Sequence, residues 1–157
     1  MRSRLQCDAS VVRSIGAVDV ILMFDVLLHQ VMPDWDEILR IYSSVSPCFL
    51  IYNPQFIASE KTVRLLDLGE QEYFANVPHD RSCPTYRHLF EKMYELHPQH
   101  KRIWRDIHNV WQWGITDDDL SRKLKDLGYV MQYYKNCGQW TGLRNFENHS
   151  FVFVRPS

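Results

Sequence analysis

Residues 17–29 read AVDVILMFDVLLH, and this stretch decides the fold that we expect. Its first part, Ala17 to Met23, is an almost continuous apolar run rather than an alternating one. That pattern is typical of a strand that is covered on both faces in a parallel sheet. A helix is expected next, over residues 34–42, because Pro33 marks its entry and Asp34 suits its N-cap.

A second short apolar strand is expected at Cys48 to Tyr52, after residues 44–47 end the helix. Strand, helix and strand at this spacing predict a βαβ unit with a right-handed crossover. The following sixty or so residues are irregular, with a helix expected over 84–96 and a polar, aromatic stretch over 104–116. This region therefore predicts an insertion rather than further sheet.

The C-terminal part predicts one helix and a hairpin. Thr116 can cap a helix over residues 117–127, which Gly128 ends, because glycine commonly follows the last turn of a helix. Residues 129–136 and 150–154 then predict two antiparallel strands with a long connection.

Bulk composition is that of one ordinary domain. The chain has 157 residues, of which 45% are apolar and 24% charged. A net charge of −1 gives no overall attraction to nucleic acid or to an anionic membrane, and no apolar run approaches the ~20 residues of a membrane span. The N-terminus does not read as a signal peptide, and four cysteines without a C-x-x-C pair suit a reducing compartment. We therefore expect a cytoplasmic protein without nucleic-acid or membrane partners.

Histidine and cysteine spacing predicts no metal site. His97 and His100 form one pair with Pro98 between them, and no second pair has ligand spacing. A structural zinc needs four ligands, so this pair alone does not provide a site.

Two N-terminal motifs resemble one enzyme family. Cys7-Asp8-Ala9 is similar to the Gly-Asp-Ala step that ends the third strand of class I S-adenosylmethionine-dependent methyltransferases, and residues 18–29 resemble that family's fourth strand and following loop. Asp8 precedes Asp19 by eleven residues, a separation typical of the family. Residues 62–69 and 104–114 look like segments of methyltransferases that act on small molecules.

This resemblance implies a fold, a cofactor and a substrate class. The fold is α/β, the Rossmann-like seven-stranded methyltransferase fold, with a mostly parallel sheet that ends in an antiparallel hairpin. The cofactor is S-adenosylmethionine and the substrate is a small-molecule methyl acceptor. Residues 1–157 then form a single partial domain, in which 55–115 are an insertion that supplies a lid or acceptor pocket.

The chain departs from the family at its glycines. The family binds its cofactor at a glycine-rich turn after the first strand, where the backbone approaches the ligand closely. This sequence has six glycines but no G-x-G, and sixteen residues precede Ala17. We therefore expect an incomplete fold without its first two strands, a fragment of a longer enzyme that binds cofactor poorly by itself. The open sheet edge predicts self-association.

Cofactor contacts are expected at two strand ends, from five residues: Asp8, Ala9, Met23, Phe24 and Asp25. Asp8 is expected to face the adenine amino group, and the carboxyl end of a parallel strand is where α/β folds bind ligands. The alternatives are an ordinary turn aspartate for Asp8 and a packed strand end with a solvated carboxylate for Asp25.

Acceptor contacts are expected on the loops that follow. His29 and His108 are candidate catalytic residues that orient the acceptor or remove its proton, and the candidate substrate-binding residues are Tyr52, Asn53, Arg105 and Trp113. The alternatives are structural: a histidine that packs its own loop, loop initiation by Asn-Pro, and tryptophans buried against the sheet.

Two other functions compete with methyl transfer. A non-catalytic interaction module that retains half of the fold would dock a partner chain on the open sheet edge. A different nucleotide-binding α/β enzyme, such as a dehydrogenase, also needs the missing glycine loop and does not explain the terminal hairpin.

Overall fold

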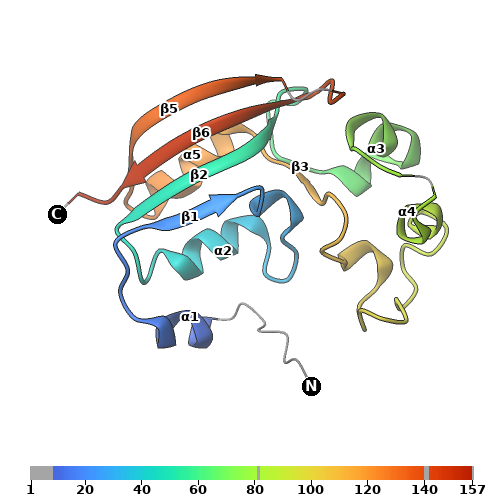
Figure 1. Ribbon diagram of the computed structural model, residues 1–157, viewed down its shortest axis with the longest axis horizontal. Helices are drawn as coiled ribbons and strands as arrows, with labels where there is room; N and C mark the ends of the chain where they lie inside the picture. Colours follow the sequence, from blue (N-terminus) through green and yellow to red (C-terminus); the bar gives the residue numbers. More distant parts are fainter. Residues whose placement is uncertain (1–8, 81, 140–141, 157) are drawn as a thin grey trace.

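The computed structural model describes residues 9–80, 82–139 and 142–156, and shows a four-stranded sheet with an α-helical layer and an irregular insertion (Figure 1). Single 3₁₀ turns lie at Leu27–His29, Leu65–Leu68 and Trp104–Asp106. The helices and strands are α1 (Ala9–Ile15), β1 (Ile21–Phe24), α2 (Trp35–Tyr42), β2 (Cys48–Phe56), β3 (Val63–Arg64), α3 (Glu70–Asn76), α4 (Pro84–His88), β4 (Trp113–Gly114), α5 (Asp117–Asp126), β5 (Val130–Gln139) and β6 (Phe146–Val154).

The main sheet has the strand order β1-β2-β6-β5. β1 pairs with β2 in parallel, which confirms the predicted βαβ unit of β1, α2 and β2. β6 is antiparallel to both β2 and β5, which confirms the terminal hairpin. The expectation of a mostly parallel sheet is wrong for the described residues, because two of the three pairings are antiparallel. The cause is β6, which inserts between β2 and β5.

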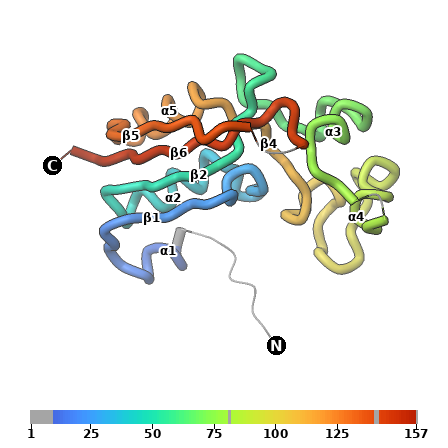
Figure 2. The backbone as a smooth tube through the Cα atoms, turned by 45° about the horizontal axis from the view of Figure 1, so that its top comes forward, coloured from blue at the N-terminus to red at the C-terminus, as the bar shows by residue number. Residues whose placement is uncertain are grey.

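The α2 and α5 helices cover one face of this sheet (Figures 1 and 2). Each β-strand places alternate side chains on one face, and Met23, Ile51 and Phe151 are buried there in one cross-strand row. Leu39 of α2 and Leu124 of α5, both fully buried, pack into the same core. The main core therefore lies between the sheet and these two helices.

Both covering helices begin where the sequence predicts. The Thr116 side chain caps α5 by accepting a hydrogen bond from the backbone N–H of Asp119 at 3.3 Å. Asp34 holds the N-cap position of α2, but its carboxylate instead accepts from the Met32 N–H at 3.4 Å. None of the described helices has the length and apolar character needed to cross a membrane.

Several elements differ in length from their predictions. β1 begins only at Ile21, and β5 and β6 extend to Gln139 and back to Phe146, so their connection is shorter than expected. β2 continues through Phe56, because β6 pairs with each of its residues and supports the Asn-Pro step within the strand. The helix expected over 84–96 ends at His88. The carbonyls of Met93 and Glu95 accept hydrogen bonds from residues 105 and 104, so tertiary pairing replaces the helical pattern there.

The insertion forms a second apolar core beside the sheet. It gathers around the fully buried side chains of Leu65, Tyr73 and Leu89, with Trp111 also buried. Phe146 of β6 belongs to this core, and its ring centroid lies 5.0 Å from that of Phe56. The insertion is therefore packed onto the end of β2 and β6.

A small β3–β4 ladder joins residues 62–69 to residues 104–114, the two segments that look like small-molecule methyltransferases, with Val63 opposite Gly114. At Gly114 a Cβ atom would lie only 2.8 Å from Cγ of Phe56. The absence of a side chain at this position is what lets the ladder approach the end of β2.

We expect Gly114→Ala to lower the free energy of unfolding by about 1–3 kcal/mol, because overpacking at a buried contact forces the neighbouring ring to shift. Urea unfolding measures the change. Phe56→Leu should recover part of the loss in the double variant, since the two residues are in contact. An alanine variant as stable as the parent chain would contradict this packing.

Candidate functional site

Asp25 follows β1 directly and has the features of a ligand-binding residue. Its φ of 52° is in the left-handed region, which costs energy for a residue with a side chain. Its backbone N–H donates to the Tyr52 carbonyl at 2.9 Å, which fixes it against β2. One carboxylate oxygen is buried without a hydrogen-bond partner in the described structure. Burial raises the pKa of the Asp25 carboxyl, and the nearby His29 partly opposes this rise.

Tyr52 lies at the same edge, directly opposite Phe24 in the β1–β2 register. Burial raises the pKa of its phenol, and the neighbouring Cys137 and Asp25 raise it further. Its partner on β6 is Ser150, whose hydroxyl lies 3.5 Å from the Cys137 thiol. The carboxyl end of β1 therefore brings together a carboxylate, a phenol, a thiol and a hydroxyl.

His29 is held by the insertion. Its Nδ1 lies 3.0 Å from the Val110 carbonyl, which can only accept a hydrogen bond, so Nδ1 carries the proton and Nε2 is the basic nitrogen of the neutral ring. Its ring meets Trp111 edge to face, with the centroids 6.1 Å apart. These contacts favour the loop-packing interpretation of His29, and a catalytic role stays a prediction.

His108 lies beside the same loop, so the structure brings the two predicted histidines together. Its Nδ1 is 3.2 Å from the His29 carbonyl oxygen, and its Nε2 is 3.1 Å from the Arg102 guanidinium. Arg102 also donates to the Val31 carbonyl at 3.1 Å. His108 and Arg102 thus hold the insertion to the loop that follows β1.

Arg105 and Trp113 also make structural contacts. Arg105 forms an ion pair with Asp67 at 2.5 Å, and the Trp113 indole N–H donates to the Gln30 carbonyl at 2.7 Å. The Arg64 guanidinium lies over the Trp113 ring at 5.7 Å. Their contact with an acceptor stays a prediction, since these interactions account for their present positions.

Of the remaining predicted residues, Phe24 lies at this edge, opposite Tyr52, and the others do not. Met23 points into the helix-side core, Phe24 is 53% exposed on the opposite face, and Asn53 is fully buried within β2. Ala9 begins α1 instead of ending a strand, because Val12 anchors that helix against α2. Asp8 lies outside the described residues.

Sequence reasoning missed a buried polar cluster centred on His149. Its Nδ1 lies 2.8 Å from the Asp117 carboxylate and its Nε2 3.4 Å from Glu147. Gln55, opposite Glu147 and only 1% exposed, has neither amide atom hydrogen-bonded in the described structure. Glu147 and His149 are two residues apart, so the sequence alone could have placed them on one face of a strand. Asp117 comes from α5, and no local sequence pattern predicts its contact with His149.

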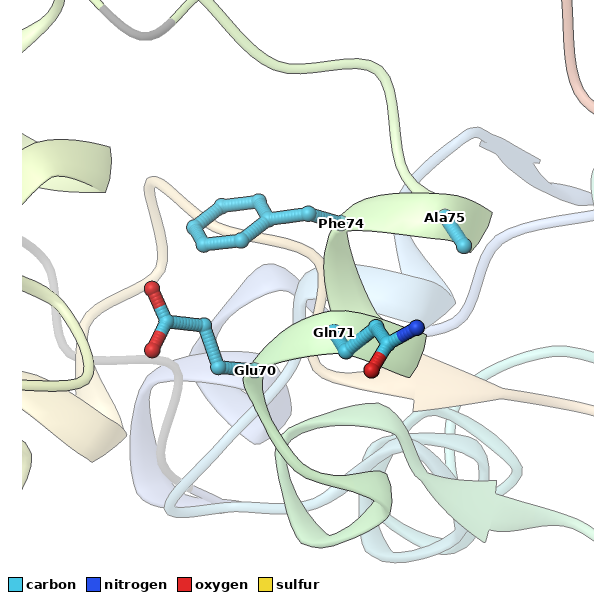
Figure 3. Close-up of a pocket in the computed structure, with 4 residues that line it drawn as sticks. All are labelled: Glu70, Gln71, Phe74 and Ala75. Atoms are coloured by element: carbon cyan, nitrogen blue, oxygen red, sulfur yellow. The ribbon is translucent and has the colours of Figure 1, made fainter.

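No cluster of three or more metal-ligating side chains occurs in residues 9–80, 82–139 and 142–156. A pocket is lined by Glu70, Gln71, Phe74 and Ala75 on α3 (Figure 3). It contains none of the predicted site residues, so the carboxyl end of β1 remains the candidate site.

Comparisons with known proteins give structural likeness only. No family model and no curated protein matches the sequence. The N-terminal domain of EvdMO1, solved in the presence of SAH and D-fucose, matches with 13% identity over 96% of this chain and 53% of that one, at a TM-score of 0.51. The same domain with SAH bound matches with 14% identity over 96% of this chain and 52% of that one, at a TM-score of 0.46. Magnesium protoporphyrin IX methyltransferase (ChlM) from Synechocystis PCC 6803, with SAH bound, matches with 13% identity over 90% of this chain and 46% of that one, at a TM-score of 0.46.

The chain has a methyltransferase-like α/β fold. It spans about half the length of the solved chains that it matches. At 13% identity, the first of the EvdMO1 matches shows the fold and leaves the chemistry to be argued from the residues.

His97 in the insertion gives a pH-dependent prediction. Its side chain is 6% exposed and Nδ1 accepts a hydrogen bond from the Gln99 N–H at 3.2 Å. Burial, and then the neighbouring His100, lower the pKa of His97 below its ordinary value of 6.5. The folded state therefore favours the neutral ring. Its contribution to the free energy of unfolding is complete above pH 6.5 and is lost as the pH falls below that value.

We expect the urea midpoint to fall between pH 7.5 and pH 5.5, and His97→Asn to show a smaller fall, since asparagine retains an acceptor near Nδ1 but does not titrate. His88→Gln, at an exposed histidine paired with Glu91, is the matched control and should keep the parent dependence. An unchanged dependence in His97→Asn would rule out this assignment.

Proposed function

We propose that the chain forms the C-terminal part of an enzyme that transfers a methyl group from S-adenosylmethionine to a small-molecule acceptor. The observation that carries this proposal is Asp25, a strained residue with a buried, unpartnered carboxylate oxygen at the carboxyl end of parallel strand β1. Support comes from the sequence resemblance and from the solved EvdMO1 domain, which shares the fold and was solved with SAH.

The edge residues fit one end of this cofactor. A carboxylate and a phenol suit a ligand that carries a positive charge and N–H donors, so Asp25 and Tyr52 would hold the methionine portion. The sequence has no G-x-G turn for close backbone contact with the rest of the ligand. We therefore propose that this chain supplies part of the cofactor site and that the remainder belongs to a longer enzyme.

The bound cofactor supplies an activated methyl group on a sulfonium, and the chain's residues position the acceptor and receive its proton. The neutral His29 ring suits proton acceptance at Nε2, because its Nδ1–H donates to the Val110 carbonyl. The same nitrogen would orient the acceptor. Alignment of the reacting atoms provides much of the rate enhancement in such a transfer.

The insertion, residues 55–115, is proposed to determine which acceptor binds. It packs on the loop after β1 through His108 and Arg102, next to the proposed reaction centre. Loops fixed to a rigid scaffold commonly carry specificity, and this one has its own apolar core.

Amide NMR titration with S-adenosylhomocysteine tests the location of the cofactor edge. We expect weak, roughly millimolar binding (about −4 kcal/mol) with shift changes at Asp25 and Tyr52. Asp25→Asn should weaken the binding of S-adenosylhomocysteine by about tenfold or more, because it removes a hydrogen bond to a charged group. Asp118→Asn, at an exposed carboxylate on α5, is the matched control and should have no effect. Shift changes confined to residues 70–75 would contradict the assignment.

A further inference from the structure

The pocket on α3 combines a carboxylate with an aromatic ring. Its volume is about 520 Å³, within the range of small-molecule sites, and Glu70, Gln71, Phe74 and Ala75 line it. Glu70 and Phe74 are one helical turn apart, and Figure 3 shows the carboxylate and the ring projecting to the same side of α3. Glu70, Gln71 and Ala75 are exposed, so a ligand can reach the pocket from solvent.

An aromatic cluster holds the Phe74 ring in place. The centroid of this ring lies 4.5 Å from that of His79, and 5.3, 5.5 and 6.3 Å from those of Tyr73, Phe90 and Tyr86. Tyr73 anchors the cluster, because it is fully buried in the core of the insertion. Phe74 itself is half-buried, which leaves part of its ring at the pocket. The pocket therefore has a preformed aromatic wall, and little ordering is needed when a ligand binds.

The Glu70 carboxylate has no counter-ion among the residues that the structure describes. Asp67, three residues earlier, is paired with Arg105, whereas no lysine, arginine or histidine of the described chain forms an ion pair with Glu70. The pocket therefore has a negative charge beside its aromatic wall, and that charge is available to a ligand.

This combination of groups selects one ligand class. An anion would be repelled by Glu70, and a hard metal ion needs several oxygen ligands, of which the pocket offers too few. A positively charged nitrogen is attracted both by a carboxylate and by the face of an aromatic ring. Alkyl or aryl groups on that nitrogen find apolar contacts at Phe74 and Ala75.

We propose that the α3 pocket binds an organic ammonium ion, with its charged nitrogen between the Glu70 carboxylate and the Phe74 ring. The apolar body of the ligand lies against Ala75, and the Gln71 amide oxygen can accept a hydrogen bond from a primary ammonium. The pocket shares no residue with the carboxyl end of β1. The proposal therefore stands whether or not the chain takes part in methyl transfer.

Benzyltrimethylammonium is the probe, added to the 157-residue protein in an amide NMR titration at neutral pH and low salt. We expect saturable shift changes at residues 70–75, with a roughly millimolar dissociation constant. Benzyl alcohol and phenylacetate carry the same ring with a neutral and a negative group, and each should bind about fivefold more weakly or worse. Salt at about 0.5 M should weaken the binding of the ammonium ion, because it screens the carboxylate.

Variants separate the contributions of the carboxylate and the ring. Glu70→Gln and Phe74→Leu should each weaken the binding of the ammonium ion by about three- to fivefold. Glu72→Gln removes the same charge from an exposed residue of α3 outside the pocket, and it should bind like the parent protein. Glu70→Lys should reverse the preference, so that phenylacetate binds more tightly than benzyltrimethylammonium. Circular dichroism confirms that each variant is folded.

Three results would overturn the proposal. The first is the absence of shift changes at residues 70–75 with benzyltrimethylammonium. The second is equal binding of the ammonium ion and benzyl alcohol to the parent protein, which would make the site merely apolar. The third is equal binding of the ammonium ion to Glu70→Gln and Glu72→Gln, which would remove the role of the pocket carboxylate.

Discussion

The parallel pairing of β1 with β2 is the interaction on which the site depends. It sets Phe24 opposite Tyr52, and the next backbone hydrogen bond, from the Asp25 N–H to the Tyr52 carbonyl, holds Asp25 in a left-handed conformation. That conformation is costly in isolation and is maintained by the ladder before it. The site therefore inherits its geometry from four residue pairs of parallel sheet, with its carboxylate at the strand end where α/β folds bind ligands.

The insertion provides the second constraint. His108 and Trp113, which the sequence offered as acceptor contacts, instead hold the insertion to the loop after β1, and Arg102 joins them. Each of the three side chains bonds a backbone carbonyl of the loop, at His29, Gln30 and Val31 respectively. A segment tied down in this way can present an acceptor surface in a fixed position, which alignment-dependent chemistry needs.

Local patterns in the sequence predicted the local elements. The apolar run of β1, the acidic start of α2 and the capping threonine of α5 each act within a few residues. Long-range pairing was beyond such patterns: the insertion of β6 between β2 and β5, the early end of α4, and the meeting of residues 62–69 with 104–114. Asp25 was predictable from its place after a strand, whereas the contact between His149 and Asp117 joins residues 32 positions apart.

The central claim is that this chain contributes one part of a cofactor site whose glycine-rich part it does not contain. Calorimetric titration of the purified chain with S-adenosylhomocysteine tests it most directly. We expect no binding with a micromolar dissociation constant, because the sequence has no G-x-G turn to supply its share of hydrogen bonds to the ligand, each worth about 1 kcal/mol or more. Micromolar binding would contradict the account and would mean that these 157 residues contain a complete, rearranged cofactor site.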